Sequence, residues 1–512
     1  ARIEINAPDL PGLMIDVGRS RRYPYGPDAA HVLGYVAAVS ENDLDDDPLL
    51  KLPGFRVGRA GIEKVHDMDL RGTGGSSEVE VNAFGRMIRE LSRREGQPGA
   101  EVTLTLDMGL QEYIAKRLGD ESASVVVMDV RNGDVLAMVS NPAYDSNDFN
   151  RGLSSAEWQR LVNNERSPLI NKSIAGVYSP GSTFKMMVLL AALEKGVISP
   201  DHKVHCSGEY ELGDAKFHCW KRRGHGFVDA MEAITESCDV YFYEIAKRTG
   251  IDRIAATARK FGLDAPTGID LPGEQGGLIP TRDWKRATRD EPWHQGETVI
   301  AGIGQGFVLL TPLQLALMTA RLANGGRAIK PHLTRAIGNT PEERRQPAAI
   351  PSMNIPPGHL ALVTEAMNRV VNHPTGTARR SATGIEDFPM AGKTGTVQVR
   401  RISKLEREQG VRKNEELPWK YRDHALFIGF APVENPRYAI SVVVEHGGGG
   451  SSTAAPIARD VLVEAYNRGS AGPGVAIAGN GQPQRSGEQA SAGTTDGAPA
   501  QTELATRAED GT

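Results

Sequence analysis

The spacing of apolar positions changes character near residue 100. Before it, apolar runs are short and broken by glycine, and SSEVEVNAFGRMIREL (76–91) alternates polar and apolar positions as a strand does. After it, apolar positions with helical spacing, as in MGLQEYIAKRL (108–118), alternate with continuous apolar runs such as YAISVVVEHG (438–447). This pattern predicts an α/β domain that follows a smaller strand-rich module.

Two changes in composition set the predicted domain limits. The stretch SRREGQPGA (92–100) is charged and then rich in Gly and Pro, so we expect a linker that ends the first domain. After Tyr466 no aromatic residue occurs, and small and polar residues dominate. Such a composition cannot bury enough surface to fold. The predicted organisation is an N-terminal domain over 1–100, a large domain over 101–469 and a disordered tail over 470–512.

Overall composition excludes some functions. The formal net charge is −5, so no basic surface is indicated and no nucleic-acid partner is expected. The sequence has no run of about 18 or more apolar residues, and therefore predicts no membrane-spanning helix within itself. It also opens without an initiator Met or a signal segment, so we expect a targeting or anchoring segment upstream.

The stretch YSPGSTFKMMVLLAALEKGV (178–197) places a serine at the start of a strongly apolar helix and a lysine one turn later. Residues three apart share a helical face, so we expect Ser182 and Lys185 to lie close enough to exchange a proton. A serine hydroxyl needs a neighbouring base to act as a nucleophile. The apolar neighbours and the positive end of the helix dipole both disfavour a charged Lys185. The alternative is a helix cap followed by a surface lysine.

Two later segments favour the catalytic interpretation. ESCDVYFYEIAKR places Ser237 and Asp239 at a helix start, and MAGKTGTVQV places Lys393, Thr394 and Gly395 at the head of a strand. Each pattern is weak alone, because Ser-x-Asp is usually a cap and Lys-Thr-Gly is usually a turn. Ser-x-x-Lys, Ser-x-Asn/Asp and Lys-Thr-Gly in this order resemble the three motifs of penicillin-binding proteins and serine β-lactamases.

Further blocks extend the resemblance to class B penicillin-binding proteins. GRAGIEKVHDMDLRGTGG (58–75) is similar to the glycine-rich signature of their N-terminal pedestal domain. GIGQGFVLLTPLQLA, HALFIGFAP and TAAPIARDVL resemble other blocks of that family, so the resemblance covers about residues 20–468. Asp239, where many relatives have Asn, and the long segment with CWKRRGHG before it resemble the elongation-type members.

This resemblance implies a fold, an activity and partners. The implied fold is the α/β (α+β) serine penicilloyl-transferase fold, an antiparallel sheet flanked by helices, with an elongated pedestal or dimerisation-type domain over 1–100. The implied enzyme is a D,D-transpeptidase that cross-links peptidoglycan stem peptides during cell elongation and is acylated by β-lactams. It would act at the periplasmic face of the inner membrane, held by an N-terminal helix absent from this chain. Its pedestal would bind a membrane glycosyltransferase and rod-complex scaffold proteins.

The same resemblance implies roles for single residues. Lys185 takes the proton of Ser182, which attacks the carbonyl of the penultimate D-Ala. The backbone N–H groups of Ser182 and Thr396 bind the oxyanion. Lys393 and the hydroxyls that follow it suit the terminal carboxylate, and Gly395 leaves the strand edge open for the substrate backbone. The implied catalytic set is Ser182, Lys185, Ser237, Asp239, Lys393, Thr394, Gly395 and Thr396.

All three cysteines of the chain lie in one window around HCWKRRGHG. Cys206, Cys219 and Cys238 with His225 would form a closed structural zinc site, because Cys and His are the preferred ligands of zinc. A Cys206–Cys219 disulfide with Cys238 free is one alternative, since an exported protein can form it. Three unrelated buried cysteines are another. Rival ligands for a single position are His205, Asp214 and His218.

Other functions share parts of this pattern. A D,D-carboxypeptidase or a serine β-lactamase has the same three motifs, although a single-domain hydrolase would not need the first hundred residues. A non-catalytic β-lactam sensor or scaffold would acylate once or not at all, and the intact Ser182, Lys185 and Lys393 argue against a loss of the chemistry. The charged segment RRISKLEREQGVRKNEELPWKYRD (400–423) is expected to form a mobile flap beside the Lys393 strand or, alternatively, an exposed helix.

Overall fold

The computed structural model describes residues 20–470 except 44–46, 53, 85–86, 339–349, 401–405 and 407–409. These residues fall within one of the two units into which the chain divides. The predicted disordered tail, apart from Ser470, lies outside the described residues, as do residues 1–19. No helix in the described part of the chain is long and apolar enough to span a membrane.

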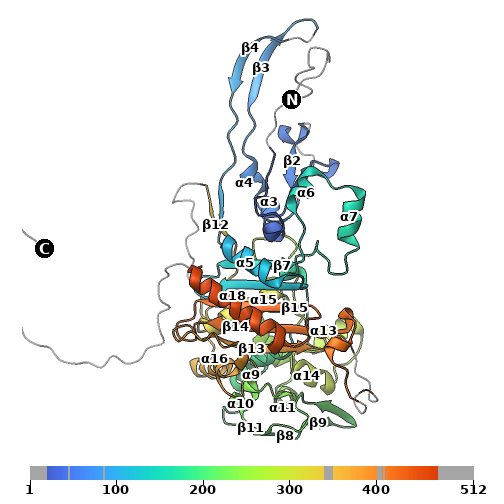
Figure 1. Cartoon of the computed structure of the whole chain (residues 1–512), viewed down its shortest axis with the longest axis vertical. Coiled ribbons are helices and arrows are strands. Elements are labelled where there is room, and N and C mark those ends of the chain that lie inside the picture. The colour runs from blue at the N-terminus through green and yellow to red at the C-terminus, as the bar shows by residue number, and fades with distance from the viewer. Residues whose placement is uncertain are drawn as a thin grey trace, which may run out of the picture. The chain divides into compact units, whose positions relative to one another are not determined.

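A five-stranded antiparallel sheet forms the centre of this unit, in the order β13-β14-β15-β6-β7 (Figure 1). Its inner strands β6 and β15, two of the apolar runs in the sequence, are buried at every position. Such continuous burial requires cover on both faces of the sheet. The strands are β6 (Ala123–Asp129), β7 (Val135–Asn141), β13 (Ala391–Val397), β14 (His424–Ala431) and β15 (Tyr438–Val444).

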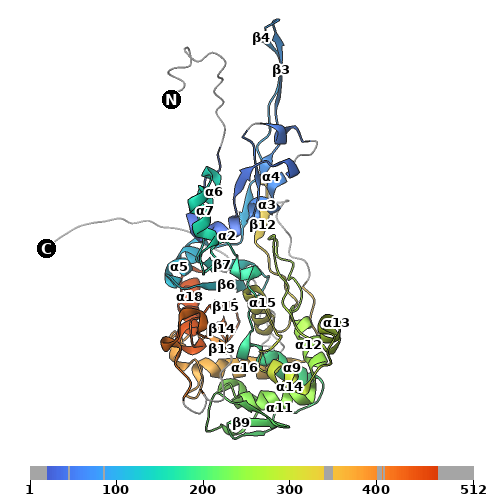
Figure 2. The ribbon, with the colours of Figure 1, turned by 90° about the vertical axis from the view of Figure 1, so that its right-hand side faces the viewer.

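Helices supply that cover. On one face α5 (Met108–Leu118) and α18 (Ala455–Arg468) pack together and on the sheet. On the other face α15 (Pro312–Ala323) packs on β6 and β15 (Figure 2). An antiparallel sheet flanked by helices is the predicted fold class, which is confirmed.

A second group of helices brings the three motifs together. Helix α9 (Lys185–Glu194) is buried along almost its whole length, as its apolar sequence requires. It packs against α11 (Asp239–Thr249) and α16 (Pro357–Asn372), and α16 packs on β13. The turn that precedes α9 also contacts β13. The first motif, at the start of α9, therefore lies against both α11, which begins with the second motif, and β13, which carries the third.

The cysteine-bearing segment forms two small antiparallel strand pairs between α9 and α10 (Ala230–Thr235). One pair aligns Gly226 with Cys206, which places two parts of the segment side by side. Both pairs contact α11, the helix of the second motif. The strands are β8 (Val204–Cys206), β9 (Glu209–Leu212), β10 (Ala215–His218) and β11 (Gly226–Val228).

The prediction of a single strand over 76–91 is wrong. The chain reverses within it and forms a hairpin of β3 (Ser76–Val81) and β4 (Met87–Arg94). The Asn82 side chain accepts the N–H of Phe84, a local turn that competes with a continuous strand. Nearly all positions of both strands are exposed, so the alternation in the sequence does not mark a buried face.

The predicted linker before residue 100 is bonded to the module that it follows. Thr73 and Gln97 exchange two backbone hydrogen bonds of 3.0 Å. His66 Nε2 lies 2.9 Å from Thr334 Oγ1, which joins the N-terminal module to the large domain. The domain limit at residue 100 stays a prediction. Two short strands, β5 (Val102–Leu104) and β12 (Thr334–Ile337), pair antiparallel at this junction.

Candidate active site

Ser182 lies in a 3-10 turn, η5 (Gly181–Phe184), that leads directly into α9. Gly181 has a left-handed φ of +55°, and a Cβ there would come within 2.9 Å of Val397 Cγ2. Glycine therefore lets the turn approach β13 closely. The Gly181 N–H also donates to Gly304 O at 2.9 Å. Ser182 is thus held half-buried beside the third motif.

Lys185 is 0% exposed, and its amine makes three hydrogen bonds, all to the second motif. Nζ donates to Ser237 O at 2.9 Å, to Ser237 Oγ at 3.2 Å and to Asp239 Oδ1 at 2.7 Å. Its burial agrees with the apolar neighbourhood read from the sequence. Among the described residues the Ser182 hydroxyl makes no hydrogen bond, so the expected Ser182–Lys185 contact is not made in this state.

The backbone of the second motif is strained where it turns toward Lys185. Ser237 has a φ of +57°, a left-handed conformation that non-glycine residues rarely adopt and that is common at functional sites. It lies between α10 and α11, so that Asp239 begins α11. This geometry lets one short segment offer a carbonyl, a hydroxyl and a carboxylate to the same amine.

Lys393 is fully buried on β13, and its Nζ donates to Thr394 O at 3.1 Å. Burial, together with the nearby charge of Lys185, holds the pKa of the Lys393 amine well below its usual value. The Thr394 hydroxyl lies 2.9 Å from that of Thr377. A buried lysine with a depressed pKa beside a nucleophile is typical of an active site.

Strand β13 lies at the edge of the sheet, with one side unpaired by any other strand of the described chain. A Cβ at Gly395 would lie 3.1 Å from Pro180 O and from Thr183 Cγ2, a tight contact that would push the nucleophile turn away by a few tenths of an ångström. The Thr396 side chain is exposed, and its hydroxyl accepts the N–H of Gly450 at 3.1 Å.

The structure gathers the four predicted metal ligands into one cluster, hereafter the Cys/His cluster: Cys206, Cys219, His225 and Cys238. Their ligand atoms all lie within 4.8 Å of one another. His225 Nδ1 lies 3.4 Å from Cys206 Sγ and 3.5 Å from Cys219 Sγ. All three thiols are free and buried, and the rival ligands are not members of the group.

The thiols differ in their ease of ionisation. A hydrogen bond from Cys238, with a further one from His225, lowers the pKa of Cys219. The same bond and burial raise the pKa of Cys238, and burial raises that of Cys206. One thiolate is therefore stabilised by its neighbours. Because the remaining thiols cannot ionise readily beside it, a cation that took up three thiolates would remove this conflict.

Sequence reasoning missed Trp220, which adjoins Cys219. Its backbone N–H donates to Asp239 Oδ2 at 3.0 Å. Its indole N–H donates to the carbonyl oxygens of Glu236 and Ser237 at 3.0 and 3.1 Å. The only signal in the sequence was its place beside a candidate ligand, and nothing local predicted contact with the second motif.

The described part of the predicted flap is anchored to the domain. Residues 410–423 hold two short 3-10 turns, η8 (Asn414–Glu416) and η9 (Trp419–Tyr421), and Leu417 is buried. The Trp419 ring packs 4.5 Å from the ring of His446. A long exposed helix is therefore not formed in this part, and the expected mobility stays a prediction.

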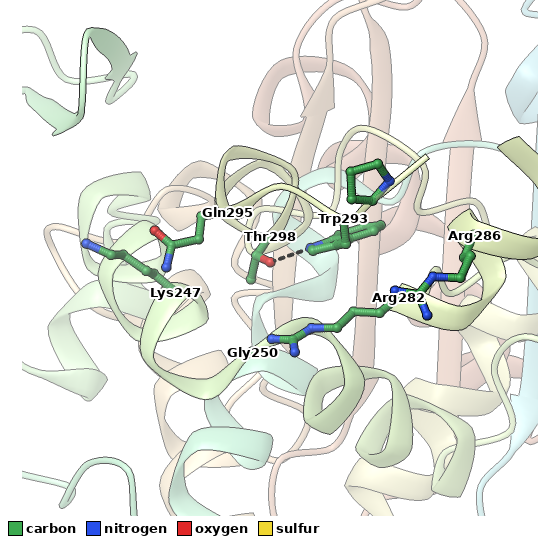
Figure 3. A pocket seen from close by; sticks show the side chains of 8 residues that line it. Lys247, Gly250, Arg282, Arg286, Trp293, Gln295 and Thr298 are labelled. Carbon is green, nitrogen blue, oxygen red and sulfur yellow. Dashed lines mark hydrogen bonds between the residues drawn. The ribbon is translucent and has the colours of Figure 1, made fainter. Parts of the chain in front are cut away.

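A separate hollow of about 230 Å³ lies where α11, α13 (Arg282–Arg289) and α14 (Gln295–Ala301) meet. In Figure 3 the Trp293 indole points to the Thr298 hydroxyl, to which it donates at 2.7 Å. None of the predicted catalytic residues lines it. The lining residues are Lys247, Gly250, Arg282, Arg286, Pro292, Trp293, Gln295 and Thr298, which include three cations and no carboxylate.

Comparison with known proteins identifies the class to which this fold and site belong. Residues 123–463 match the family model of the penicillin binding protein transpeptidase domain, and residues 1–104 match that of the penicillin-binding protein dimerisation domain. The chain belongs to the penicillin-binding protein transpeptidases, and the resemblance to their class B members is confirmed.

Within that family the chain is similar to elongation-type proteins. It is 39% identical over 471 residues to the peptidoglycan D,D-transpeptidase MrdA of Haemophilus influenzae, covering 90% of this chain and 72% of the relative. The solved structure of Pseudomonas aeruginosa PBP2 in complex with WCK 5153 matches with a TM-score of 0.75 and 37% identity, covering 88% and 93% of the two chains. The complex of PBP2 with MreC from Helicobacter pylori matches with a TM-score of 0.78 and 33% identity, covering 88% and 79%.

Proposed function

We propose that this chain cross-links peptidoglycan stem peptides through an acyl intermediate on Ser182. The serine-type D,D-transpeptidase activity of cell elongation belongs to the chain through its family and its relatives. The assignment of roles to single residues rests on one observation above all. The amine of the fully buried Lys185 is fixed by the second motif, one helical turn from Ser182.

Acylation begins when Ser182 loses its proton to Lys185 and attacks the carbonyl of the penultimate D-Ala. For this step Lys185 needs a free lone pair on its amine. The Asp239 carboxylate lies 2.7 Å from that amine and holds it in place.

The tetrahedral intermediate needs fixed donors, and the backbone N–H groups of Ser182 and Thr396 are proposed to supply them. A single donor of this kind contributes about 3 kcal/mol of transition-state stabilisation. Close packing of the Gly181 turn against β13 supports the pairing, because it brings the two backbones together. Glycine at 395 is what permits that approach.

Release of D-Ala requires a proton and frees the site for the acceptor amine. Ser237, whose hydroxyl accepts from Lys185, is the proposed relay to the leaving nitrogen. Lys393 is proposed to meet the terminal carboxylate of the donor with the hydroxyls of Thr394 and Thr396. Its depressed pKa fits this role, since an arriving carboxylate would restore the charged form.

Intact mass spectrometry tests the reaction type. Wild-type protein should gain one penicilloyl adduct and, with a peptide donor and an amine acceptor, should yield the cross-linked product. A carboxypeptidase would release D-Ala without using the amine, and a β-lactamase would lose its adduct within minutes. A sensor would keep the adduct and turn over no peptide.

We also propose that the Cys/His cluster holds a structural zinc ion. Three sulfurs and one imidazole are a standard donor set for a closed zinc site, and their ligand atoms are close enough for one ion to reach all four. His225 Nε2 is buried, makes no hydrogen bond and lies 4.0 Å from Glu236 Oε2. A carboxylate in that place commonly orients a ligating imidazole. Bound zinc would cross-link the segment to the second motif.

Metal analysis tests this site. Purified protein should contain close to one zinc per chain, and Cys206→Ser should remove it. Chelation or acid should lower the melting temperature, because the thiols must be deprotonated to bind. His205→Ala, which changes a histidine outside the cluster, is the matched control. Metal-free protein with unchanged melting after chelation would contradict the proposal.

The proposed place of action is the periplasmic face of the inner membrane, where the pedestal binds a scaffold protein of the MreC type and a membrane glycosyltransferase. The similarity of this chain to the PBP2 that is solved in complex with MreC supports such a scaffold partner. The β3–β4 hairpin supports it too, because its sheet has only two strands and its apolar side chains face solvent. They are Val79, Val81, Phe84, Met87, Ile88 and Leu91, which are 40–89% exposed.

A binding assay separates this partner proposal from the catalytic one. Phe84→Glu should weaken capture of a purified MreC-type scaffold domain at least tenfold, because Phe84 is the most exposed of these side chains at 89%. Penicillin acylation should stay unchanged. Trp158→Glu, at an exposed tryptophan on another element, is the control. Equal binding by Phe84→Glu and wild type would contradict the use of this surface.

A further inference from the structure

Trp220 and Lys185 bind the same two groups of the second motif. Lys185 Nζ donates to Ser237 O and to Asp239 Oδ1. The Trp220 indole N–H donates to the same Ser237 O at 3.1 Å, and its backbone N–H donates to the other oxygen of the Asp239 carboxylate at 3.0 Å. Two of the three groups that accept from the buried amine, the Ser237 carbonyl and the Asp239 carboxylate, are therefore also held by Trp220.

Trp220 is equally well joined to the Cys/His cluster. It follows Cys219, whose Sγ accepts the N–H of Asp239 at 3.4 Å. Its ring meets the His225 ring edge-on, with centroids 5.6 Å apart. Trp220 thus contacts a candidate ligand and the Ser237 carbonyl through its side chain, and the Asp239 carboxylate through its backbone N–H.

Burial does not explain this arrangement. Trp220 is 59% exposed, so the side chain adds little to the hydrophobic core. An exposed indole is nevertheless held by hydrogen bonds to two main-chain carbonyls, those of Glu236 and Ser237. The carbonyl of Ser237 belongs to a residue with a left-handed φ of +57°, a conformation that its surroundings must maintain.

We propose that Trp220 is a positioning residue of the acyl-transfer reaction. It fixes the Ser237 carbonyl and the Asp239 carboxylate where they hold Lys185 Nζ. Because Trp220 also contacts the Cys/His cluster, the cluster restrains the position of that amine through Trp220. The proposal rests on the proposed function, in which Lys185 is the base. A displacement of about 1 Å in a catalytic group can cost about 100-fold in rate, so a small displacement of Lys185 Nζ should slow acylation measurably.

The test uses Trp220→Phe, which removes the indole N–H and keeps an aromatic ring and the backbone N–H. Stopped-flow acylation by a chromogenic penicillin or cephalosporin separates the binding constant from the acylation rate constant. We expect the rate constant to fall about fivefold, the equivalent of one hydrogen bond, with the binding constant unchanged within twofold. Rates are counted per chain that acylates, so partial unfolding does not imitate the effect. Trp158→Phe, at a tryptophan 44% exposed on α7 (Ser155–Val162), should behave as wild type.

A double-mutant cycle tests the route through the cluster. Cys206→Ser alters the cluster at a ligand that lies outside the second motif and contacts His225 and Cys238. If the cluster acts through Trp220, the double variant should acylate no more slowly than the slower single variant, within twofold. Rate losses that multiply would overturn the route. A weaker binding constant with a normal rate constant, or no change in either, would overturn the positioning role. Failure of wild type to acylate would instead refute the proposed function.

Discussion

Lys185 Nζ and Asp239 Oδ1 lie 2.7 Å apart in a position where the lysine has no exposed surface. A buried ion pair is costly to form. Removing only one of its two partners costs more still, because the other charge then stays buried and unpaired. The pair joins the first motif to the second across 54 residues of sequence. Stability and chemistry therefore depend on the same contact.

Removal of only the Asp239 carboxylate tests whether stability depends on the Lys185–Asp239 contact. Asp239→Ala should destabilise the protein by about 3 kcal/mol or more, because it leaves the Lys185 amine buried without its partner. Lys185→Met in the same background should restore most of the loss, although neither variant should acylate. Urea unfolding measures the free energy of unfolding of each. An Asp239→Ala protein as stable as wild type would show that the pair is not ionic.

Ser182→Ala should abolish covalent penicillin labelling and leave the fold intact. The serine is half-buried and its hydroxyl makes no hydrogen bond within the described chain, so the free energy of unfolding should change by less than about 1 kcal/mol. Intact mass after incubation with penicillin is the measurement. Ser173→Ala, whose hydroxyl bonds elsewhere in the core, should still label. Stoichiometric labelling of Ser182→Ala would refute the nucleophile.

Gly395→Ala should slow acylation by separating β13 from the nucleophile turn. The added Cβ would lie 3.1 Å from Pro180 O, a backbone atom that cannot move aside without displacing Ser182. We expect a cost of about 1–3 kcal/mol in stability and a larger proportional loss of acylation rate. Gly358→Ala, where no atom lies within 4 Å of the new Cβ, is the matched control. Normal acylation by Gly395→Ala would argue against this close approach.

The free energy of unfolding should decrease as the pH is lowered, because the buried His424 side chain resists protonation in the folded protein. Burial, with the nearby His446, lowers the pKa of His424 from 6.5 to about 4, and the His446 N–H donates to its unprotonated Nδ1 at 2.9 Å. Below pH 6.5 the unfolded chain takes up a proton that the folded chain resists, so stability is lost as pH falls from 6.5 to about 4. The full loss is about 3 kcal/mol.

His424→Asn retains an acceptor near the same place and cannot take up that proton. Its free energy of unfolding, measured in urea at pH 4 and pH 7, should depend less on pH than that of wild type. His205→Asn, at an exposed histidine, is the control. Equal pH dependence in wild type and His424→Asn would contradict the assignment. His31, whose pKa burial also lowers to about 4, should account for part of the remaining slope.

Sequence alone determined the parts of this protein that depend on local pattern and on motif order. The continuous apolar run over 438–447 identified β15, because a strand buried on both faces is apolar at nearly every position. Ser182, in the turn before α9, and Lys185, at its start, were found by their helical spacing. The cysteines and His225 were grouped by their types, and the fold brings them together.

Only the tertiary structure decided which groups meet across long separations. The alternation over 76–91 gave no sign that Asn82 would turn the chain into a hairpin, since alternation is the same in one strand or two. Helical spacing brought Lys185 near Ser182, but packing of α9 on α11 turned its amine to Ser237 and Asp239. The Trp220 indole donates to two backbone carbonyls, and a backbone acceptor cannot be recognised from the sequence. Such contacts depend on where whole elements pack, and local pattern does not encode that.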